Sequence, residues 1–183
     1  PLLDQALSGD DRLRCCGWFG LEADARGRPQ VDLDNARAGR EAARYLASLG
    51  LQRFVYVHNP LNKRSWERFG GFRDELGSGF SEVHEFLRGE RMPPGKWTGE
   101  DQSKDLADYL PGIEPPFGLY AYDDAHGLRA VEAAHATGLR VPEDMALVVT
   151  SANSFACAYY TPSLTTVANS MRLQGYEAAR LLV

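Results

Sequence analysis

Two adjacent carboxylates, Asp123 and Asp124, come one residue after a short apolar run at Phe117–Ala121. The run does not alternate with polar residues, which is typical of a strand covered by helices on both faces. A helical pattern follows the acids and ends at Gly138. In open α/β sheets, ligands bind at the carboxyl ends of the strands. The pair could therefore accept hydrogen bonds from a ligand, or could accept the free N–H groups at the start of the helix.

Strands and helices alternate along most of the chain, and this alternation predicts the fold class. The predicted strands are Leu13–Cys16, Phe54–His58, Ser81–Leu87, Phe117–Ala121 and Met145–Thr150, and the predicted helices include Ala36–Leu49, Ser65–Leu76, Gln102–Leu110 and Met171–Val183. Strands that alternate with helices of this length imply βαβ crossovers. We therefore expect an α/β fold with a doubly wound parallel sheet, in which residues 1–33 and the last helix cannot form a core alone.

The composition is that of an ordinary globular protein. Of the 183 residues, 44% are hydrophobic and 25% are charged, which excludes disorder and fibrous repeats. No apolar run approaches the roughly 20 residues needed to cross a bilayer. The first segment has no basic start followed by an apolar stretch, so the sequence predicts no membrane association and no secretory leader.

Charge and cysteine content limit the partners and the compartment. A net charge of −5 argues against this chain gripping a nucleic-acid backbone by itself. Cys15 and Cys16 are adjacent, where a disulfide would be strained, and Cys157 stands alone. The cysteines favour a reducing, cytoplasmic compartment, and their spacing predicts no metal site.

Four separated blocks then occur in an order that is recognisable. They read VDLDNARAGREAARYLASLG (31–50), WERFGGF (66–72), AYDDAHGLRAVEAAHATGLRVPEDMALV (121–148) and TPSLTTVANSMRLQGYEAARLL (161–182). Together they resemble the effector-binding core of the lactose-repressor/galactose-repressor family, and the last block is most similar to the xylose-operon regulators. The resemblance implies two lobes of the periplasmic-binding-protein type, with a sugar or similar small molecule bound between them.

The same resemblance implies that the chain is truncated at both ends. Residues 34–167 would form a nearly complete carboxyl-terminal lobe, and residues 1–33 and 168–183 would be remnants of the amino-terminal lobe. A helix-turn-helix would precede them in the full-length protein, which would be a homodimer.

The resemblance also assigns candidate ligand-binding residues. Arg68 matches the arginine of the family's RxxGF motif, which binds sugar hydroxyls, and a planar guanidinium suits that task. The alternative is a solvated helix arginine. Trp97 matches a family aromatic that covers the apolar face of the sugar, or else pins its own Pro/Gly loop. Trp66 and Trp18 are further candidates for the same cleft.

Polar residues at the strand ends complete the expected site. Asp123 replaces a common family asparagine, and we expect it to contact ligand while Asp124 caps the helix. Ser151 stands where family members usually have an acid, so Ser151 or Asn153 would substitute as neutral groups. Asn169 matches a family position near the ligand. Losing the acid puts ordinary sugar recognition in doubt, since a hydrogen bond to a charged group contributes about 1.5–3 kcal/mol.

These residues predict a ligand sensor of a transcriptional regulator, which meets operator DNA only through the separate helix-turn-helix. A periplasmic-type sugar-binding protein for transport is the alternative. Neither a GxSxG elbow nor a phosphate-binding glycine loop is present, so we expect no catalysis and no cofactor.

Overall fold

The computed structural model describes residues 31–77, 82–86, 99–151, 157–159 and 161–180. The chain divides into two compact units. One unit is residues 34–169, and the other combines residues 1–33 with residues 170–183. The helix α7, Met171–Arg180, belongs to the second unit. All other elements below belong to the unit 34–169.

The described residues of this unit form a parallel five-stranded sheet, which confirms the predicted fold class. The strands are β1 (Arg53–Val57), β2 (Glu82–Phe86), β3 (Phe117–Ala121), β4 (Met145–Ser151) and β5 (Thr165–Ala168), in the order β2-β1-β3-β4-β5. Because β1 lies between β2 and β3, the chain crosses from one side of β1 to the other after β2. The register aligns the strand ends, since Ala121 pairs with both Val57 and Val149.

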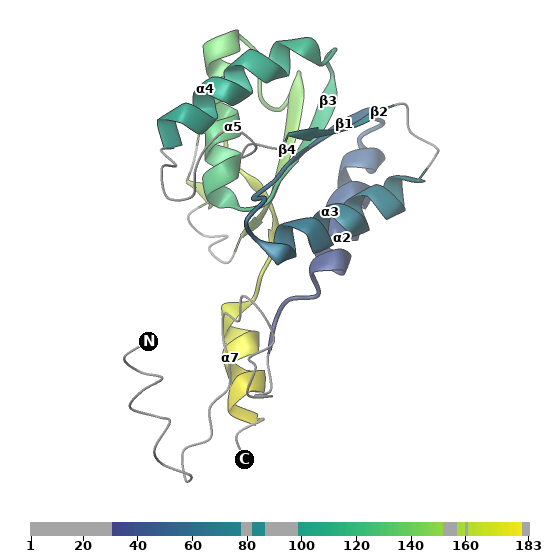
Figure 1. Ribbon diagram of the computed structural model, residues 1–183, viewed down its shortest axis with the longest axis vertical. Coiled ribbons are helices and arrows are strands. Elements are labelled where there is room, and N and C mark those ends of the chain that lie inside the picture. Colours follow the sequence, from purple (N-terminus) through teal and green to yellow (C-terminus); the bar gives the residue numbers. More distant parts are fainter. Residues whose placement is uncertain (1–30, 78–81, 87–98, 152–156, 160, 181–183) are drawn as a thin grey trace. The chain divides into compact units, whose positions relative to one another are not determined.

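Helices cover both faces of the sheet, as expected for parallel strands. In Figure 1, α2 (Asn35–Ser48) and α3 (Lys63–Leu76) lie on one side of the sheet. On the other side lie α4 (Gly99–Tyr109) and α5 (Asp124–Thr137), which are connected through the short 3-10 helix η2 (Leu110–Gly112) and β3. The predicted helices are all confirmed where the structure describes them, apart from shifts of their ends.

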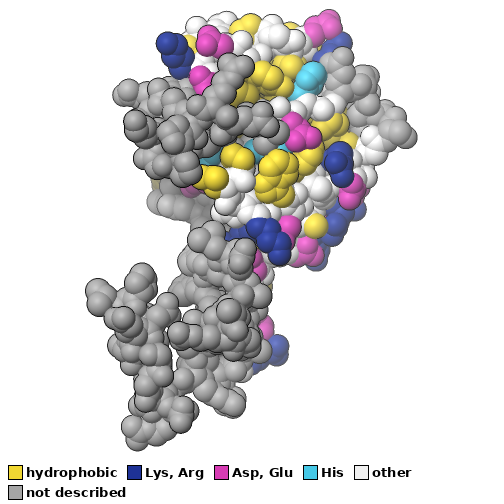
Figure 2. All heavy atoms as spheres, in the orientation of Figure 1, with side chains coloured by type: hydrophobic (Ala, Val, Ile, Leu, Met, Phe, Trp, Pro, Cys, Tyr) yellow, Lys and Arg dark blue, Asp and Glu magenta, His cyan; other side chains and the backbone are white. Residues whose placement is uncertain are grey.

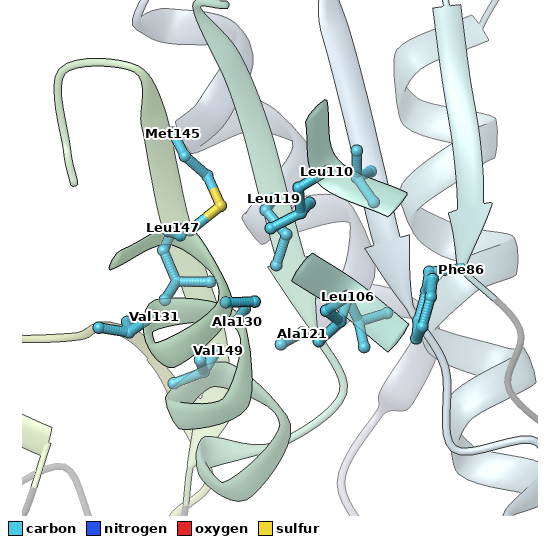
Figure 3. Packing of buried hydrophobic residues seen from close by; sticks show 14 of the residues in the cluster. Phe86, Leu106, Leu110, Leu119, Ala121, Ala130, Val131, Met145, Leu147 and Val149 are labelled. Carbon is cyan, nitrogen blue, oxygen red and sulfur yellow. The ribbon is translucent and has the colours of Figure 1, made fainter. Parts of the chain in front are cut away.

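Alternate residues along the strands pack into two separate hydrophobic cores, one on each face of the sheet. Phe54 and Tyr56 of β1 pack with Phe72 of α3, whereas Val55 and Val57 belong to the opposite cluster. Figure 3 shows that opposite cluster, in which side chains of β3 and β4 meet α4 and α5. Its labelled members include Leu106, Leu119, Ala121, Ala130, Val131, Leu147 and Val149. Burial on both faces explains why the strands read as continuous apolar runs.

Both signs of charge are spread over the described surface. On the face in Figure 2, the coloured acidic and basic side chains are interspersed and do not gather into one basic patch. Among the described helices, none is long and apolar enough to cross a membrane.

Candidate ligand-binding site

Polar residues gather where four neighbouring strands end. His58 follows β1, Tyr122 and Asp123 follow β3, Ser151 ends β4, and Asn169 follows β5. Backbone pairing continues to this edge, since the Tyr122 N–H donates to the Val57 carbonyl over 3.1 Å and the Asn169 N–H donates to the Ser151 carbonyl over 2.8 Å. Because parallel strands present their carboxyl ends at one edge, these groups form a single candidate site.

Arg68 reaches this edge from α3 and is not a solvated helix arginine. Its residue surface is only 5% exposed. The Nε–H donates to Asn35 Oδ1 over 2.9 Å, and Nη1 donates to the Tyr122 carbonyl. The guanidinium also lies 4.6 Å from the centre of the Tyr122 ring. Among the described residues Nη2 has no hydrogen-bond partner, so this nitrogen remains for a ligand.

The structure changes the capping role that the sequence suggested for the two aspartates after β3. Asp123, not Asp124, is the N-cap of α5, and its Oδ1 accepts the His126 backbone N–H over 2.9 Å. The prediction that Asp124 is the cap was wrong, because the helix begins at Asp124 itself, one residue earlier than that prediction requires. Asp123 is extended at φ −146° and ψ −179°, the geometry that lets a side chain turn back onto the first helical turn.

Asp123 also holds His126, a residue that the sequence analysis did not identify. His126 Nδ1 lies 2.6 Å from the same Asp123 Oδ1, and its ring stands perpendicular to the Tyr122 ring at 5.7 Å. Burial raises the pKa of the Asp123 carboxyl, but the hydrogen bonds and charge of His126, with a smaller contribution from Arg68, outweigh it, and the net shift is downward. Asp123 is therefore a carboxylate with Oδ2 available as an acceptor. Its spacing of three residues from His126 was the available signal in the sequence.

Asp124 is the first residue of α5, and its side chain contacts the end of the neighbouring strand β4. Its Oδ2 accepts a hydrogen bond from Ser151 Oγ over 3.2 Å, and Ser151 is buried. A carboxylate is thus present beside Ser151, the position at which the sequence resemblance leads one to expect an acid. Asn169 contributes its backbone N–H to β4 at this point.

Trp66 lies at the start of α3 and is 43% exposed. Its Nε1–H already donates to the Pro60 carbonyl over 3.1 Å, and its ring packs on His58 at 4.5 Å. The indole can therefore offer an apolar face to a ligand but not its N–H. Three other predicted site residues, Trp18, Trp97 and Asn153, lie outside the described residues.

Together, the contacts join Arg68, Tyr122, Asp123 and His126 into one connected group. It offers a guanidinium donor, a carboxylate acceptor and an aromatic ring, a combination that suits hydroxyl groups on a small molecule. Within the described chain, no group of three or more His, Cys, Asp or Glu residues could hold a metal ion.

Comparison with known families decides the assignment. The profile of the periplasmic binding protein-like domain matches residues 43–183. The chain belongs to this family. The homologues of this periplasmic-binding-protein-like domain also confirm its resemblance to lactose-repressor/galactose-repressor regulators.

One such homologue is the transcriptional regulator CelR of Thermobifida fusca, which is 33% identical over 157 residues, or 84% of this chain and 44% of the regulator. The solved CelR–cellobiose complex matches with a TM-score of 0.74 at 25% identity and covers 99% of this chain and 61% of that one. The xylose-binding activator XylR gives 0.73 at 24% identity, with 99% and 48% covered, and supports the fold. The domain spans about half the length of the curated relatives it matches.

Proposed function

We propose that this domain is the effector-sensing part of a bacterial transcriptional regulator and that it binds a sugar or sugar derivative. The observation that carries the proposal is the fixed guanidinium of Arg68 beside the Asp123 carboxylate at the carboxyl edge of a parallel sheet. Hydroxyl groups are both donors and acceptors, so they match this pairing. The homology to CelR, whose solved complex contains cellobiose, supports the same ligand class.

The regulator would work by closure of two lobes on the ligand. We infer that the unit 34–169 is the carboxyl-terminal lobe and that residues 1–33 and 170–183 belong to the amino-terminal lobe. Closure would bias a separate helix-turn-helix between two DNA-binding geometries in a cytoplasmic homodimer. No reaction is part of this function.

Within the described residues, Arg68 and Asp123 would bind hydroxyl groups directly. The neutral hydroxyl of Ser151 cannot act as an anionic acceptor. Asp124, which is held by Ser151, would supply that negatively charged acceptor instead. Trp66 would offer the face of its ring to the ligand, and Asn169 would contact the ligand where the chain leaves the unit 34–169. Trp18, Trp97 and Asn153 remain proposed contacts.

A ligand panel tests the function directly. The full-length gene product is mixed with cellobiose, xylose, ribose and other mono- and disaccharides, and its thermal unfolding is followed. A ligand that binds only the native state raises the unfolding midpoint with concentration, so at least one sugar should give a saturable increase. No response across the whole panel would contradict the proposal.

Matched variants of α3 test the site. Arg68→Ala should abolish the stabilisation by the best sugar, because Nη2 is its free donor at the site. Arg73→Ala removes an exposed arginine from the same helix and should leave the sugar response intact. Equal responses in both variants would exclude Arg68 from the site.

A further inference from the structure

The first turn of α2 packs against the middle of α3 with the two backbones in direct contact. A Cβ added at Gly39 would overlap the carbonyl oxygen of Arg68, and one added at Gly71 would overlap the carbonyl oxygen of Ala36. Glycine at both positions is therefore required for this approach. The contact brings the beginning of α2 beside the turn of α3 that carries Arg68.

This close approach places Asn35 within reach of the guanidinium. Asn35 is the first residue of α2 and only 4% exposed. Its Oδ1 accepts the Arg68 Nε–H over 2.9 Å, and its Nδ2 donates to Glu67 Oε2 over 3.2 Å. These two contacts fix the orientation of the side-chain amide, because only its oxygen can accept from an arginine and only its nitrogen can donate to a carboxylate.

Three contacts together fix the plane of the Arg68 guanidinium. Asn35 holds the Nε edge, the Tyr122 carbonyl holds Nη1, and the Tyr122 ring lies against the face. An arginine side chain has several rotatable bonds, and ordering it on ligand binding costs free energy. A guanidinium that is ordered beforehand presents Nη2 without that cost.

We propose that Asn35 is a positioning residue for the ligand-binding arginine, and this inference rests on the proposed function of Arg68. Asn35 does not need to touch the ligand. It follows Asp34, the residue at which the unit 34–169 begins. The point at which the chain enters this unit is therefore one residue away from Asn35. A ligand that displaces Arg68 would act through this hydrogen bond on the start of α2.

The first test reads the hydrogen bond without any ligand. In the full-length protein labelled with ¹⁵N-arginine, the Arg68 Nε–H signal is identified by its loss in Arg68→Lys, and its exchange with solvent is measured. Asn35→Ala should speed that exchange by about tenfold or more, because the acceptor is gone. Asn35→Asp keeps an oxygen at the same place and should retain slow exchange.

The second test reads the affinity for the panel sugar that stabilises the wild type most. Asn35→Ala should weaken binding by about three- to tenfold, and Asn35→Asp should restore most of the loss. Asp34→Ala is the matched control, because the Asp34 side chain caps the same helix α2 through the Arg37 N–H without touching the guanidinium. This control should lower stability but leave the affinity within about twofold.

The outcomes separate the two proposals. If Arg68→Ala weakens sugar binding and Asn35→Ala does not, the positioning role is overturned while the proposed function stands. If no sugar binds, the proposed function fails, and the exchange measurement alone decides whether Asn35 orients Arg68. Slow exchange of the Arg68 Nε–H in Asn35→Ala overturns the inference in either case, and should Asn35→Ala not fold, fast exchange in a folded Asn35→Asp overturns it too.

Discussion

Asp123 and Asp124 have the same side chain, yet one residue of displacement gives them different partners. Asp123 accepts the backbone N–H of His126, the third residue of the helix, and contacts the ring of the same histidine. Asp124 accepts a hydrogen bond from Ser151 on the neighbouring strand. The difference arises from the backbone, because only the residue before the first helical turn can fold its side chain over it. Composition cannot distinguish two adjacent acids, whereas the position of the helix start does.

His58 is the described histidine with the least solvent contact. It is fully buried among Tyr56, Trp66 and Phe69, and neither ring nitrogen has a hydrogen-bond partner. The charged group nearest to it is Glu85 of β2, with Oε2 3.4 Å from Nε2. Burial lowers the pKa of His58 from 6.5 to about 4, so the ring is neutral at neutral pH.

This shift predicts a loss of stability on acidification. Between the unfolded value of 6.5 and the folded value of about 4, the unfolded chain binds the proton more readily, so stability falls as the pH falls through this window. Between about pH 7 and about pH 5 the contribution is about 2 kcal/mol of the free energy of unfolding. His58→Phe keeps an aromatic ring and removes the titration, so urea unfolding of this variant should depend less on pH. The same pH dependence in wild type and variant would contradict the assignment.

At the scale of elements, the contact between α2 and α3 determines where Arg68 lies. Gly39 and Gly71 allow the helix backbones to touch, and this contact brings Asn35 beside the guanidinium. Apolar residues alone would hold the helices together, since Ala42, Leu46, Phe69 and Phe72 share one cluster. Without glycine they would do so at a larger separation, and the short side chain of Asn35 would not reach Arg68.

Adjacent glycines of α3 provide a controlled test of this contact. Gly71→Ala should lower the free energy of unfolding by about 1–3 kcal/mol, because the added methyl overlaps the Ala36 carbonyl. Gly70→Ala, where a Cβ would meet nothing within 4 Å, should raise it by about 0.5–1 kcal/mol through helix propensity. Chemical denaturation of both variants measures the difference. If the two substitutions have the same sign, the direct backbone contact is not required for stability.

The sequence predicted an element correctly where the burial of that element leaves a recognisable pattern in its own residues. β1, β3 and β4 were predicted from apolar runs because both faces of each strand are buried. β5 was missed, since Thr165–Ala168 is short and half exposed and has neither an apolar run nor strict alternation.

The candidate site was predicted only in part. Arg68 was found through a motif, and the structure brings it to Tyr122 and Asp123. Asn35 carries no signal of its own, because its contact with Arg68 spans 33 residues and depends on how two helices cross. Such tertiary contacts are not encoded in local spacing.

At the scale of the whole molecule, the unit 34–169 contains every strand pairing and both apolar clusters that the structure describes. A fragment of residues 34–169 should therefore fold alone and unfold in one cooperative transition. Circular dichroism during thermal unfolding measures this, and the fragment 34–164 is the matched control. The shorter fragment lacks β5, which leaves the edge of β4 unpaired, and it should unfold at a lower temperature. A fragment 34–169 without a cooperative transition would mean that the sheet depends on residues 1–33 or 170–183 for its stability.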